Sequence, residues 1–346
     1  MSVSNRADRY LRQSQFDPIG TDGQRQIQQS RVAVLGCGAL GSVAAELLAR
    51  AGVGRLRLID RDLVEWSNLQ RQSLYTEADA AVGRAKAEAA AARLRDINST
   101  IDIDEIVADV TSANIVDCLG EVDLIVDGSD NFPLRLLLND YSLRHGVPWV
   151  HGGCVGAGGQ VRLFHGRSPC FRCLVPTPPD PSTVATCDTA GVLGAATHLI
   201  ASIQVAEALK YLSGNADAVR GEVWSVDLWA NQFRSIRLDE SLAPECPACV
   251  GLRFEFLDAV APDATAATGL CGRDAIQIAG GDFRVDFDRI AVAWERIGLV
   301  QRTRFFVRLS IDEKHSLTLF RDGRALITGV RDAAHARTLY DRYVGS

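Results

Sequence analysis

Short apolar runs alternate with longer amphipathic segments along the first half of the chain. Residues 32–35 are a continuous apolar run that predicts a buried strand, and residues 39–52 have the spacing of a helix that stops at Gly52. The alternation continues with strands predicted at 55–60, 101–110 and 122–131, helices predicted at 85–98 and ending with 139–146, and two strands around a glycine-rich turn within 147–165. This pattern predicts an α/β fold, in which a doubly wound and mostly parallel sheet carries helices on both faces.

The pattern changes after about residue 250. Residues 285–300 have helical spacing of their apolar positions, and three strands with a turn at Asp322 and Gly323 precede a closing helix. The strands are predicted at 304–311, 315–320 and 324–330, and the helix at 332–345. We therefore expect an N-terminal arm and helix (1–29), a large α/β domain (30–250) and a small C-terminal α+β domain (251–346).

Composition and charge exclude several classes of protein. The 346 residues are 47% hydrophobic and 23% charged, which is sufficient for two domains with real cores. The net charge of -6 leaves no excess of cations for general binding to nucleic acid or to a membrane surface. The N-terminus lacks an apolar signal core, and no apolar run reaches the length of a spanning helix. We expect a cytoplasmic protein, in which cysteines act as ligands, nucleophiles or core residues.

A glycine-rich loop follows the first predicted strand. Gly36, Gly38 and Gly41 form the pattern G-x-G-x-x-G between a strand and a helix, so that backbone amides can face an anion at close range. Asp60 ends the second predicted strand, where such folds carry an acid that binds a ribose. This motif alone predicts a Rossmann-like nucleotide site and favours NAD or FAD.

The polar residues that follow point away from a dinucleotide. Asn68 and Arg71 lie after the second strand, and Lys86 opens the next helix. Two cations and an amide suit a polyphosphate with a terminal phosphate. Asp130 closes the fourth predicted strand, where a carboxylate opposite a triphosphate can bind Mg²⁺. Each residue taken alone is equally compatible with a solvated surface charge, a turn or a helix cap.

Two pairs of cysteines have the spacing of metal-chelating half-sites. Cys170 and Cys173 form one pair, and Cys246 and Cys249 form the other. Each pair can present two thiolates to one tetrahedral zinc ion. Because the 72 residues between the pairs exceed the usual spacing of a zinc ribbon, a redox-active or merely structural pair remains an alternative.

Cys187 stands apart from these pairs. It follows a proline-rich segment and precedes a long apolar helix, whose N-terminal dipole favours a thiolate. The sequence supports a thiol nucleophile and an inert loop residue equally. No pattern supports a chemical role for the remaining cysteines, which we expect in the core: Cys37, Cys118, Cys154 and Cys271.

Taken together, these motifs resemble a known family. The segments RYLRQ, GCGALGS, IDRDLVEWSNLQRQ, GRAKAE, DGSDNFPLR, PCFRC, TCDTAGVLG and CPAC occur in the order and near the spacing of the ubiquitin-activating-enzyme-like family of MoeB, ThiF and HesA, from about residue 8 to residue 250. The resemblance implies ATP-dependent adenylation of the C-terminal glycine carboxylate of a small ubiquitin-like sulfur carrier ending in Gly-Gly, with release of pyrophosphate. Such a reaction depends on positioning and charge neutralisation, because the attacking carboxylate is already ionised near neutral pH.

The resemblance also implies roles for individual residues. It places ATP on Gly36, Gly38 and Gly41, its ribose on Asp60, its phosphates on Asn68, Arg71 and Lys86, Mg²⁺ on Asp130 with Asn131 beside it, and zinc on Cys170, Cys173, Cys246 and Cys249. Arg12 resembles an arginine that reaches the phosphates of the neighbouring subunit, which implies a homodimer. Cys187 matches a position that takes part in sulfur transfer or thioester chemistry in some members of the family.

Several alternatives stay open on the sequence. The substrate could instead be another carboxylate or a tRNA base, and the chain could be a non-catalytic nucleotide-binding scaffold or an NAD-dependent oxidoreductase. Arg71, Lys86 and Asp130 argue against the scaffold, and the cysteine pairs together with Asn68 and Arg71 argue against the oxidoreductase. The C-terminal domain contains no recognisable rhodanese-like loop, so we expect any sulfur donor to be a separate protein. That domain either helps to recognise the carrier or a later partner, or serves as a lid or dimer element.

Overall fold

The computed structural model describes residues 8–166, 169–180, 187–238, 245–259, 267–269, 274–280 and 285–345. For Asp8, Cys187, Asp188 and residues 267–269 it describes the backbone only. The chain divides into two compact units, Met1–Ala259 and Val260–Ser346. Within the described residues, no helix combines the length and the apolar character that a membrane span requires.

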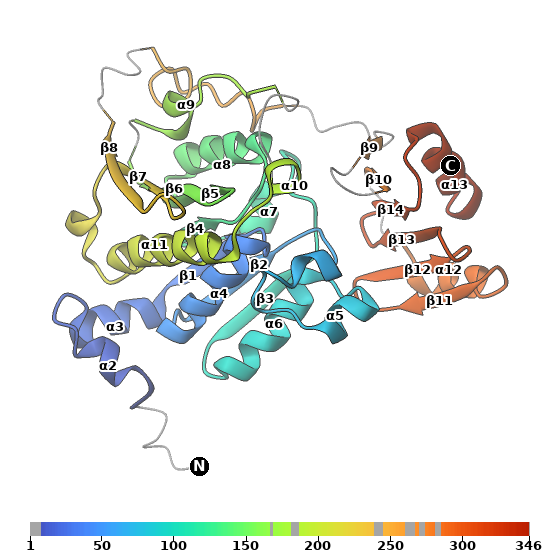
Figure 1. The fold of residues 1–346 in the computed structure, drawn as a ribbon, viewed down its shortest axis with the longest axis horizontal. Coiled ribbons are helices and arrows are strands. Elements are labelled where there is room, and N and C mark those ends of the chain that lie inside the picture. The colour runs from blue at the N-terminus through green and yellow to red at the C-terminus, as the bar shows by residue number, and fades with distance from the viewer. Residues whose placement is uncertain are drawn as a thin grey trace. The chain divides into compact units, whose positions relative to one another are not determined.

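The first unit is built around a sheet of eight strands in the order β3-β2-β1-β4-β5-β6-β7-β8 (Figure 1). The strands are β1 (Arg31–Leu35), β2 (Arg55–Ile59), β3 (Asp102–Ile106), β4 (Leu124–Asp127), β5 (Trp149–Val155), β6 (Gly158–Phe164), β7 (Glu222–Asp227) and β8 (Gln232–Arg237). β1 to β5 pair in parallel, and β6, β7 and β8 extend the sheet by antiparallel pairing. The predicted doubly wound, mostly parallel sheet is confirmed, and β7 and β8 add to it.

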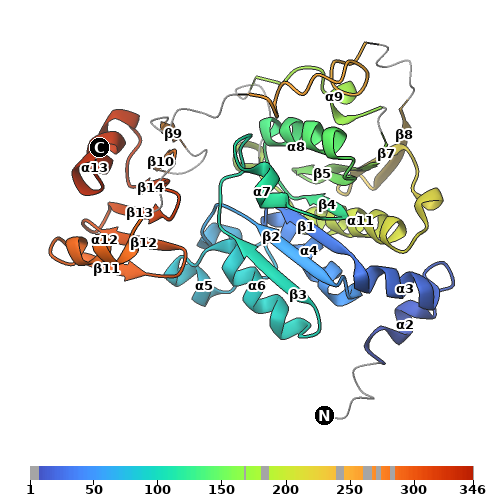
Figure 2. The ribbon, with the colours of Figure 1, turned by 180° about the vertical axis from the view of Figure 1, so that it is seen from behind.

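Helices cover both faces of this sheet (Figures 1 and 2). The helices of the unit are α2 (Leu11–Ser14), α3 (Gly20–Gln29), α4 (Ala39–Ala51), α5 (Glu77–Val82), α6 (Lys86–Ile97), α7 (Ile115–Leu119), α8 (Phe132–His145), α9 (Phe171–Leu174), α10 (Cys187–Ala190) and α11 (Gly194–Leu212), with short 3-10 turns η1 (Asp8–Tyr10), η2 (Trp66–Asn68) and η3 (Ala216–Ala218). Successive residues of β1 point to opposite faces. Val32 and Val34 pack with α4, α6 and α11, while Ala33 and Leu35 pack with α7 and α8.

One strand ends earlier than the sequence pattern predicts. β4 stops at Asp127, so Asp130 does not close the strand but lies three residues beyond it, in the loop before α8. The carboxylate of Asp127 causes this early end, because it accepts a hydrogen bond from the backbone N–H of Ser129 and turns the chain out of the sheet. The expected placement of Asp130 at the strand terminus is therefore wrong, although its place at the carboxyl edge is right.

The second unit is a small α+β module. Its sheet has the order β11-β12-β13-β14-β10-β9, and helices α12 and α13 share its main apolar core. The elements are β9 (Ala267–Gly269), β10 (Ala275–Ile278), α12 (Phe287–Trp294), β11 (Leu299–Arg302), β12 (Phe306–Ser310), β13 (Ser316–Phe320), β14 (Ala325–Thr328) and α13 (Ala333–Tyr343). The expected three-strand meander corresponds to β12, β13 and β14. The helix expected over 285–300 is shorter, since residues 299 and 300 belong to β11.

Candidate nucleotide site and cysteine cluster

Three loops meet at the carboxyl edge of the sheet, after β1, β2 and β4. β1 lies between β2 and β4 in the sheet, so these loops are neighbours in space. Gly36 has φ of 88°, and a Cβ atom there would lie 2.7 Å from the carbonyl oxygen of Gly128. A Cβ atom on Gly41 would overlap with the carbonyl oxygen of Gly36. Two of the three predicted glycines are therefore required by close packing of the loops.

Gly38 leaves space for a phosphate at the N-terminus of helix α4. It is the N-cap of the 13-residue helix α4, and no side chain caps that helix end. A Cβ atom on Gly38 would meet no protein atom within 4 Å. The helix N-terminus is thus open at the point where a backbone amide can approach an anion, which fits a nucleotide phosphate.

Asp60, at the carboxyl edge of the sheet, is hydrogen-bonded to the glycine loop. Its carboxylate accepts hydrogen bonds from the backbone N–H of Cys37 (2.6 Å) and from that of Asp62 (2.7 Å). Burial raises the pKa of Asp60, and the nearby Lys86 cation acts in the opposite direction. The residue therefore joins the loop after β2 to the loop after β1, whatever else it binds.

The predicted phosphate-binding residues already have partners within the chain. Lys86 is buried at the start of α6, and its Nζ lies 3.0 Å from a carboxylate oxygen of Asp62. Asn68 is buried and accepts a hydrogen bond from the backbone N–H of Glu65 (3.2 Å), which caps the η2 turn. Arg71 donates to the backbone carbonyl of Ser67 (2.8 Å). Asp62 is thus a charged neighbour of Lys86 that the sequence analysis did not identify.

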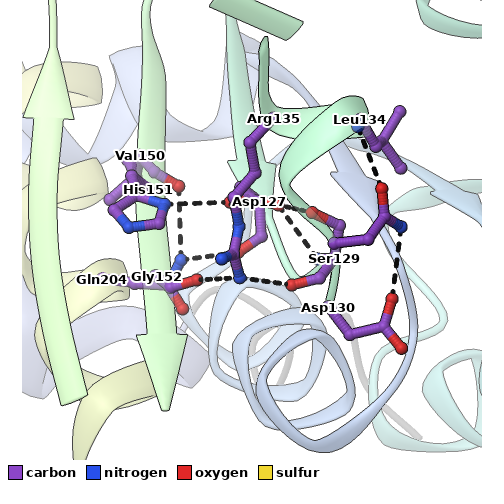
Figure 3. A network of polar contacts seen from close by, with 10 residues as sticks. Asp127, Ser129, Asp130, Leu134, Arg135, Val150, His151, Gly152 and Gln204 are labelled. Atoms are coloured by element: carbon purple, nitrogen blue, oxygen red, sulfur yellow. Dashed lines mark hydrogen bonds and ion pairs between the residues drawn. The ribbon is translucent and has the colours of Figure 1, made fainter. Parts of the chain in front are cut away.

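The loop after β4 carries Asp130 at its exposed tip. The side chain of Asn131 accepts a hydrogen bond from the backbone N–H of Leu134 (2.9 Å), as the N-cap of α8, and its Nδ2 donates to Asp130 (3.3 Å). Beneath them lies a buried network in which Asp127 is the central residue (Figure 3). This network was not predicted, although a second aspartate three residues before Asp130 was visible in the sequence.

The charge of the network is set by burial and by partners. Burial on its own would raise the pKa of Asp127, but Arg135, His151 and Ser129 outweigh it and the pKa is lowered. Burial lowers the pKa of His151, so its ring is neutral near pH 7 and the Nδ1 atom, 3.1 Å from Asp127, is the donor. Asp127 is therefore an anion that is neutralised by the guanidinium of Arg135.

Arg12 is not brought to this edge within its own chain. It lies exposed on α2, where its guanidinium contacts only the side chain of Gln15 among the described residues (3.1 Å). The adjoining Gln13 donates to the carbonyl of Ala51 (3.0 Å), at the C-terminal end of α4. Since α4 begins at the carboxyl edge and runs back along the sheet, Arg12 lies at the opposite, amino edge.

The four paired cysteines form a compact cluster. Their Sγ atoms all lie within 4.8 Å of one another, and the Sγ atom of Cys170 is 3.8 Å from those of Cys173 and Cys246. Thiolates at about 2.3 Å from a tetrahedral zinc ion lie about 3.8 Å apart, so the cluster fits zinc without rearrangement. Hydrogen bonding to Cys173 lowers the pKa of the Cys170 thiol to about 5, whereas burial raises the pKa of the Cys249 thiol to about 11.

Three residues around the cluster were not predicted. Arg162 is buried, burial lowers its pKa to about 10, and its Nε and Nη1 atoms have no hydrogen-bond partner among the described residues. The backbone N–H of Phe171, next to Cys170, donates to Asn139 of α8 (2.9 Å), and Asp140 accepts from the backbone of residue 256 (2.9 Å). A buried cation beside four thiolates offsets their negative charge.

Two cysteines with sequence-based expectations cannot be compared with described side chains, namely Cys187 and Cys271. Cys187 is the first residue of α10, but its side chain is not described, and Cys271 lies outside the described residues. Cys37 and Cys118 are buried, as expected, and Cys154 is partly buried against the core.

The sheet, the glycine loop and the cysteine cluster define the class of protein, a Rossmann-like α/β protein with a cluster of four cysteines that could hold a metal ion. A family model described as ThiF family matches residues 10–248. The chain is 40% identical over 339 residues to the sulfur carrier protein ThiS adenylyltransferase of Bacillus subtilis (strain 168), covering 97% of this chain and 99% of that protein. It is 39% identical over 248 residues to the sulfur carrier protein adenylyltransferase of Thermus thermophilus, covering 70% of this chain and 90% of that protein. The chain belongs to the ThiF family.

Solved structures share the fold. The crystal structure of E. coli MccB with ATP matches with a TM-score of 0.60 and 24% sequence identity, over 70% of this chain and 74% of that chain. At this identity, the likeness shows a shared fold over the matched part of the chain and nothing more.

Proposed function

We propose that this chain, an adenylyltransferase of the ThiF family, uses ATP to adenylate the C-terminal glycine carboxylate of a small ThiS- or MoaD-like sulfur carrier ending in Gly-Gly. The observation that carries the proposal is the 40% identity to the Bacillus subtilis ThiS adenylyltransferase, which covers 97% of this chain and so extends through the C-terminal unit. The Thermus thermophilus relative matches only 70% of this chain. This difference favours a ThiS-like carrier.

The geometry of the carboxyl edge supports ATP as the nucleotide. The open cradle at Gly38 suits a phosphate, and Asp60 is close enough to the glycine loop to bind a ribose hydroxyl beside it. Lys86 and Arg71 supply the positive charge for the phosphates, once Lys86 exchanges Asp62 for a phosphate oxygen. Asp130, exposed at the tip of its loop, is the proposed ligand for Mg²⁺, with Asn131 orienting it.

These residues can promote the reaction without a general base. The attacking carboxylate of the carrier is ionised near neutral pH, so the chain needs only to hold it in line with the α-phosphorus. Arg71 and Lys86 neutralise charge on the phosphates, and Mg²⁺ would neutralise the leaving pyrophosphate. The products are an acyl-adenylate and pyrophosphate.

The position of Arg12 supports a shared site in a homodimer. Within its own chain, Arg12 lies at the amino edge of the sheet, away from the glycine loop. It can therefore reach a nucleotide only on a second copy of the chain.

The cysteines have two proposed roles. Cys170, Cys173, Cys246 and Cys249 hold one structural zinc ion, because all four thiols are used and none is left for a substrate. Cys187, at the start of α10, is the proposed thiol for a later step in which a separate sulfur donor acts on the adenylated carrier.

Exchange of radioactive pyrophosphate into ATP tests the proposal directly. The full chain is assayed with Mg²⁺, with and without candidate carriers ending in Gly-Gly. We expect exchange only with a cognate carrier and its loss in Arg71→Ala and Asp130→Ala. Arg93→Ala and Asp117→Ala are matched controls, since both residues are exposed on helices of the same unit. ATP binding without exchange, under every carrier tested, would contradict the proposal and favour a non-catalytic scaffold.

A further inference from the structure

The loop between β4 and α8 carries Asp130, and a buried ion pair lies directly beneath it. We infer that Asp127 and Arg135 are positioning residues, which fix the backbone of this loop so that the Asp130 carboxylate meets a divalent cation at the nucleotide site. The inference rests on the proposed function, because that proposal makes Asp130 the ligand of the cation. Neither Asp127 nor Arg135 needs to touch the nucleotide.

Asp127 uses both of its carboxylate oxygens. Its Oδ1 accepts from the backbone N–H of Ser129 (2.9 Å) and from the Ser129 hydroxyl (2.5 Å). Its Oδ2 accepts from Nε of Arg135 (3.2 Å) and from Nδ1 of His151 (3.1 Å). The side chain is fully buried, at 0% exposure, so water does not compete for these bonds.

Arg135 also binds Ser129, through the backbone carbonyl of that residue. Its Nη2 donates to the backbone carbonyl of Ser129 (2.7 Å) and to the carbonyl of Gly152 on β5 (3.2 Å). The ion pair therefore binds the N–H, the hydroxyl and the C=O of Ser129 together (Figure 3). Because that carbonyl belongs to the peptide that joins Ser129 to Asp130, the backbone position of Asp130 is fixed from below.

The other side of the loop is fixed by the glycine loop. A Cβ atom on Gly128 would lie 2.5 Å from the carbonyl oxygen of Gly36 and 3.0 Å from Cα of Gly41. The two loops are thus in backbone contact. The distance from Asp130 to a phosphate held at Gly38 is determined by this contact on one side and by the ion pair on the other.

Stability alone is a weak reason for such an ion pair. Taking a carboxylate and a guanidinium out of water carries a desolvation cost that their attraction barely offsets, and an apolar pair of similar size is often as stable. What the ion pair adds is geometry, since the guanidinium is a rigid fork whose nitrogens face fixed directions. Here Nε of Arg135 is directed at Asp127, and Nη2 is directed at the backbone carbonyls of Ser129 and Gly152.

Binding of Mn²⁺ in the presence of a non-cleavable ATP analogue tests this role, with electron paramagnetic resonance of the free ion as the readout. The full chain is compared with Asp127→Asn, Arg135→Lys and the milder Ser129→Ala. We expect the Kd for Mn²⁺ to rise by roughly tenfold or more in the first two variants, as loss of a residue that orients a metal ligand typically does. The affinity for the nucleotide measured without Mn²⁺ should change less than threefold, on the order expected if the glycine loop itself is intact.

Arg57→Lys is the matched control. Arg57 pairs with Asp104 (2.9 Å) and donates to the carbonyl of Leu119 (2.9 Å), so it resembles Arg135 in its contacts but binds β3 and α7 instead of the loop. A folded Asp127→Asn or Arg135→Lys with the parent's Kd for Mn²⁺ would overturn the inference. An equal rise in the Kd for Mn²⁺ in Arg57→Lys would overturn the inference as well. So would a parent chain that binds Mn²⁺ no more tightly than Asp130→Ala.

The same set of variants separates this inference from the proposed function. A parent chain that binds Mn²⁺ through Asp130, but shows no pyrophosphate exchange with any carrier tested, would contradict the adenylation proposal. The positioning role would remain supported. If some variants unfold, Ser129→Ala decides, because it removes one hydroxyl from the network and leaves the ion pair in place. An intermediate rise in its Kd supports the inference, and an unchanged Kd counts against it.

Discussion

Alanine at Gly38 and at Gly128 should separate nucleotide binding from folding, although the two residues lie in adjoining loops. A Cβ atom on Gly38 would meet no protein atom within 4 Å, and its φ of -77° lies outside the left-handed region that favours glycine. A Cβ atom on Gly128 would lie 2.5 Å from the Gly36 carbonyl oxygen. We therefore expect Gly38→Ala to affect the ligand and Gly128→Ala to affect the fold.

The magnitude of each effect follows from these contacts. The contact at Gly128 is shorter than the 3.0 Å that real Cβ atoms keep, and because the neighbour is backbone, one loop must move by at least about 0.5 Å. A methyl group forced into a packed site costs about 1–3 kcal/mol. For a unit of this size, that lowers the melting temperature by roughly 2–12 °C. Gly38→Ala should leave the melting temperature within about 2 °C of the parent.

The affinity for ATP, in contrast to the melting temperature, should be lowered by Gly38→Ala. The methyl group of Gly38→Ala occupies the space through which the backbone approaches a phosphate, so we expect the Kd for ATP to rise. Thermal unfolding and calorimetric titration with ATP measure the two quantities on the same samples. Gly38→Ala with the parent's Kd for ATP would refute the placement of the phosphates, and Gly128→Ala with the parent's melting temperature would refute the steric argument.

Four further predictions concern other parts of the chain. Cys246→Ser should lower the zinc content from about one ion per chain to near zero, as measured by atomic emission, and should destabilise the first unit. Arg162→Gln, which removes the buried cation beside the thiolates, should speed loss of zinc to a chelator at least about tenfold, and an unchanged rate would exclude this role. Burial raises the pKa of Asp140 to about 6, above its unfolded value of about 3.9, so the folded state holds the extra proton between these values. The stabilisation contributed by Asp140 should therefore fall as the pH rises from about 4 to 6, so the free energy of unfolding of Asp140→Asn should rise relative to that of the parent over this range, as measured in urea titrations. Finally, inactive Arg12→Ala and Arg71→Ala chains, mixed and allowed to exchange subunits, should regain about a quarter of parental exchange activity, since half the dimers then hold one intact site. No recovery would exclude a site shared between subunits.

The sequence predicts those parts of the fold in which local pattern and burial agree. β1 and β4 are nearly continuous apolar runs because both faces of the sheet are covered, whereas β2 alternates arginine with leucine before Ile59. The glycine loop lies between a strand and a helix, as its spacing predicts. β8 has no such pattern. All six of its residues are exposed, because it is the last strand of the sheet, and so it carries no alternation to detect. Strand β9 has only three residues, which is too short for an alternating pattern to be recognised in the sequence.

The candidate site was predictable to the extent that its residues are close in sequence. The paired cysteines and the glycine loop are short motifs with a fixed spacing, and the structure brings each set together. The buried network was not predictable, because Asp127 meets His151 and Gln204 from 24 and 77 residues away. Ser129 and Arg135, two and eight residues after Asp127, are near enough for a pattern, but an aspartate followed by a serine and an arginine at these distances is too common to stand out.

Helix α8 connects the two parts of the first unit that carry chemistry. Its N-cap, Asn131, donates to Asp130, and Arg135 holds the loop that precedes it. Eight residues beyond the cap, or about 12 Å along the helix, Asn139 binds the backbone beside Cys170. A helix is stiff over this length, so residues that fix its middle also limit the movement of its capped end. Under the proposed function, in which all four thiols bind one metal ion, the cysteine cluster would contribute to the candidate site by anchoring the helix from which Asp130 is held.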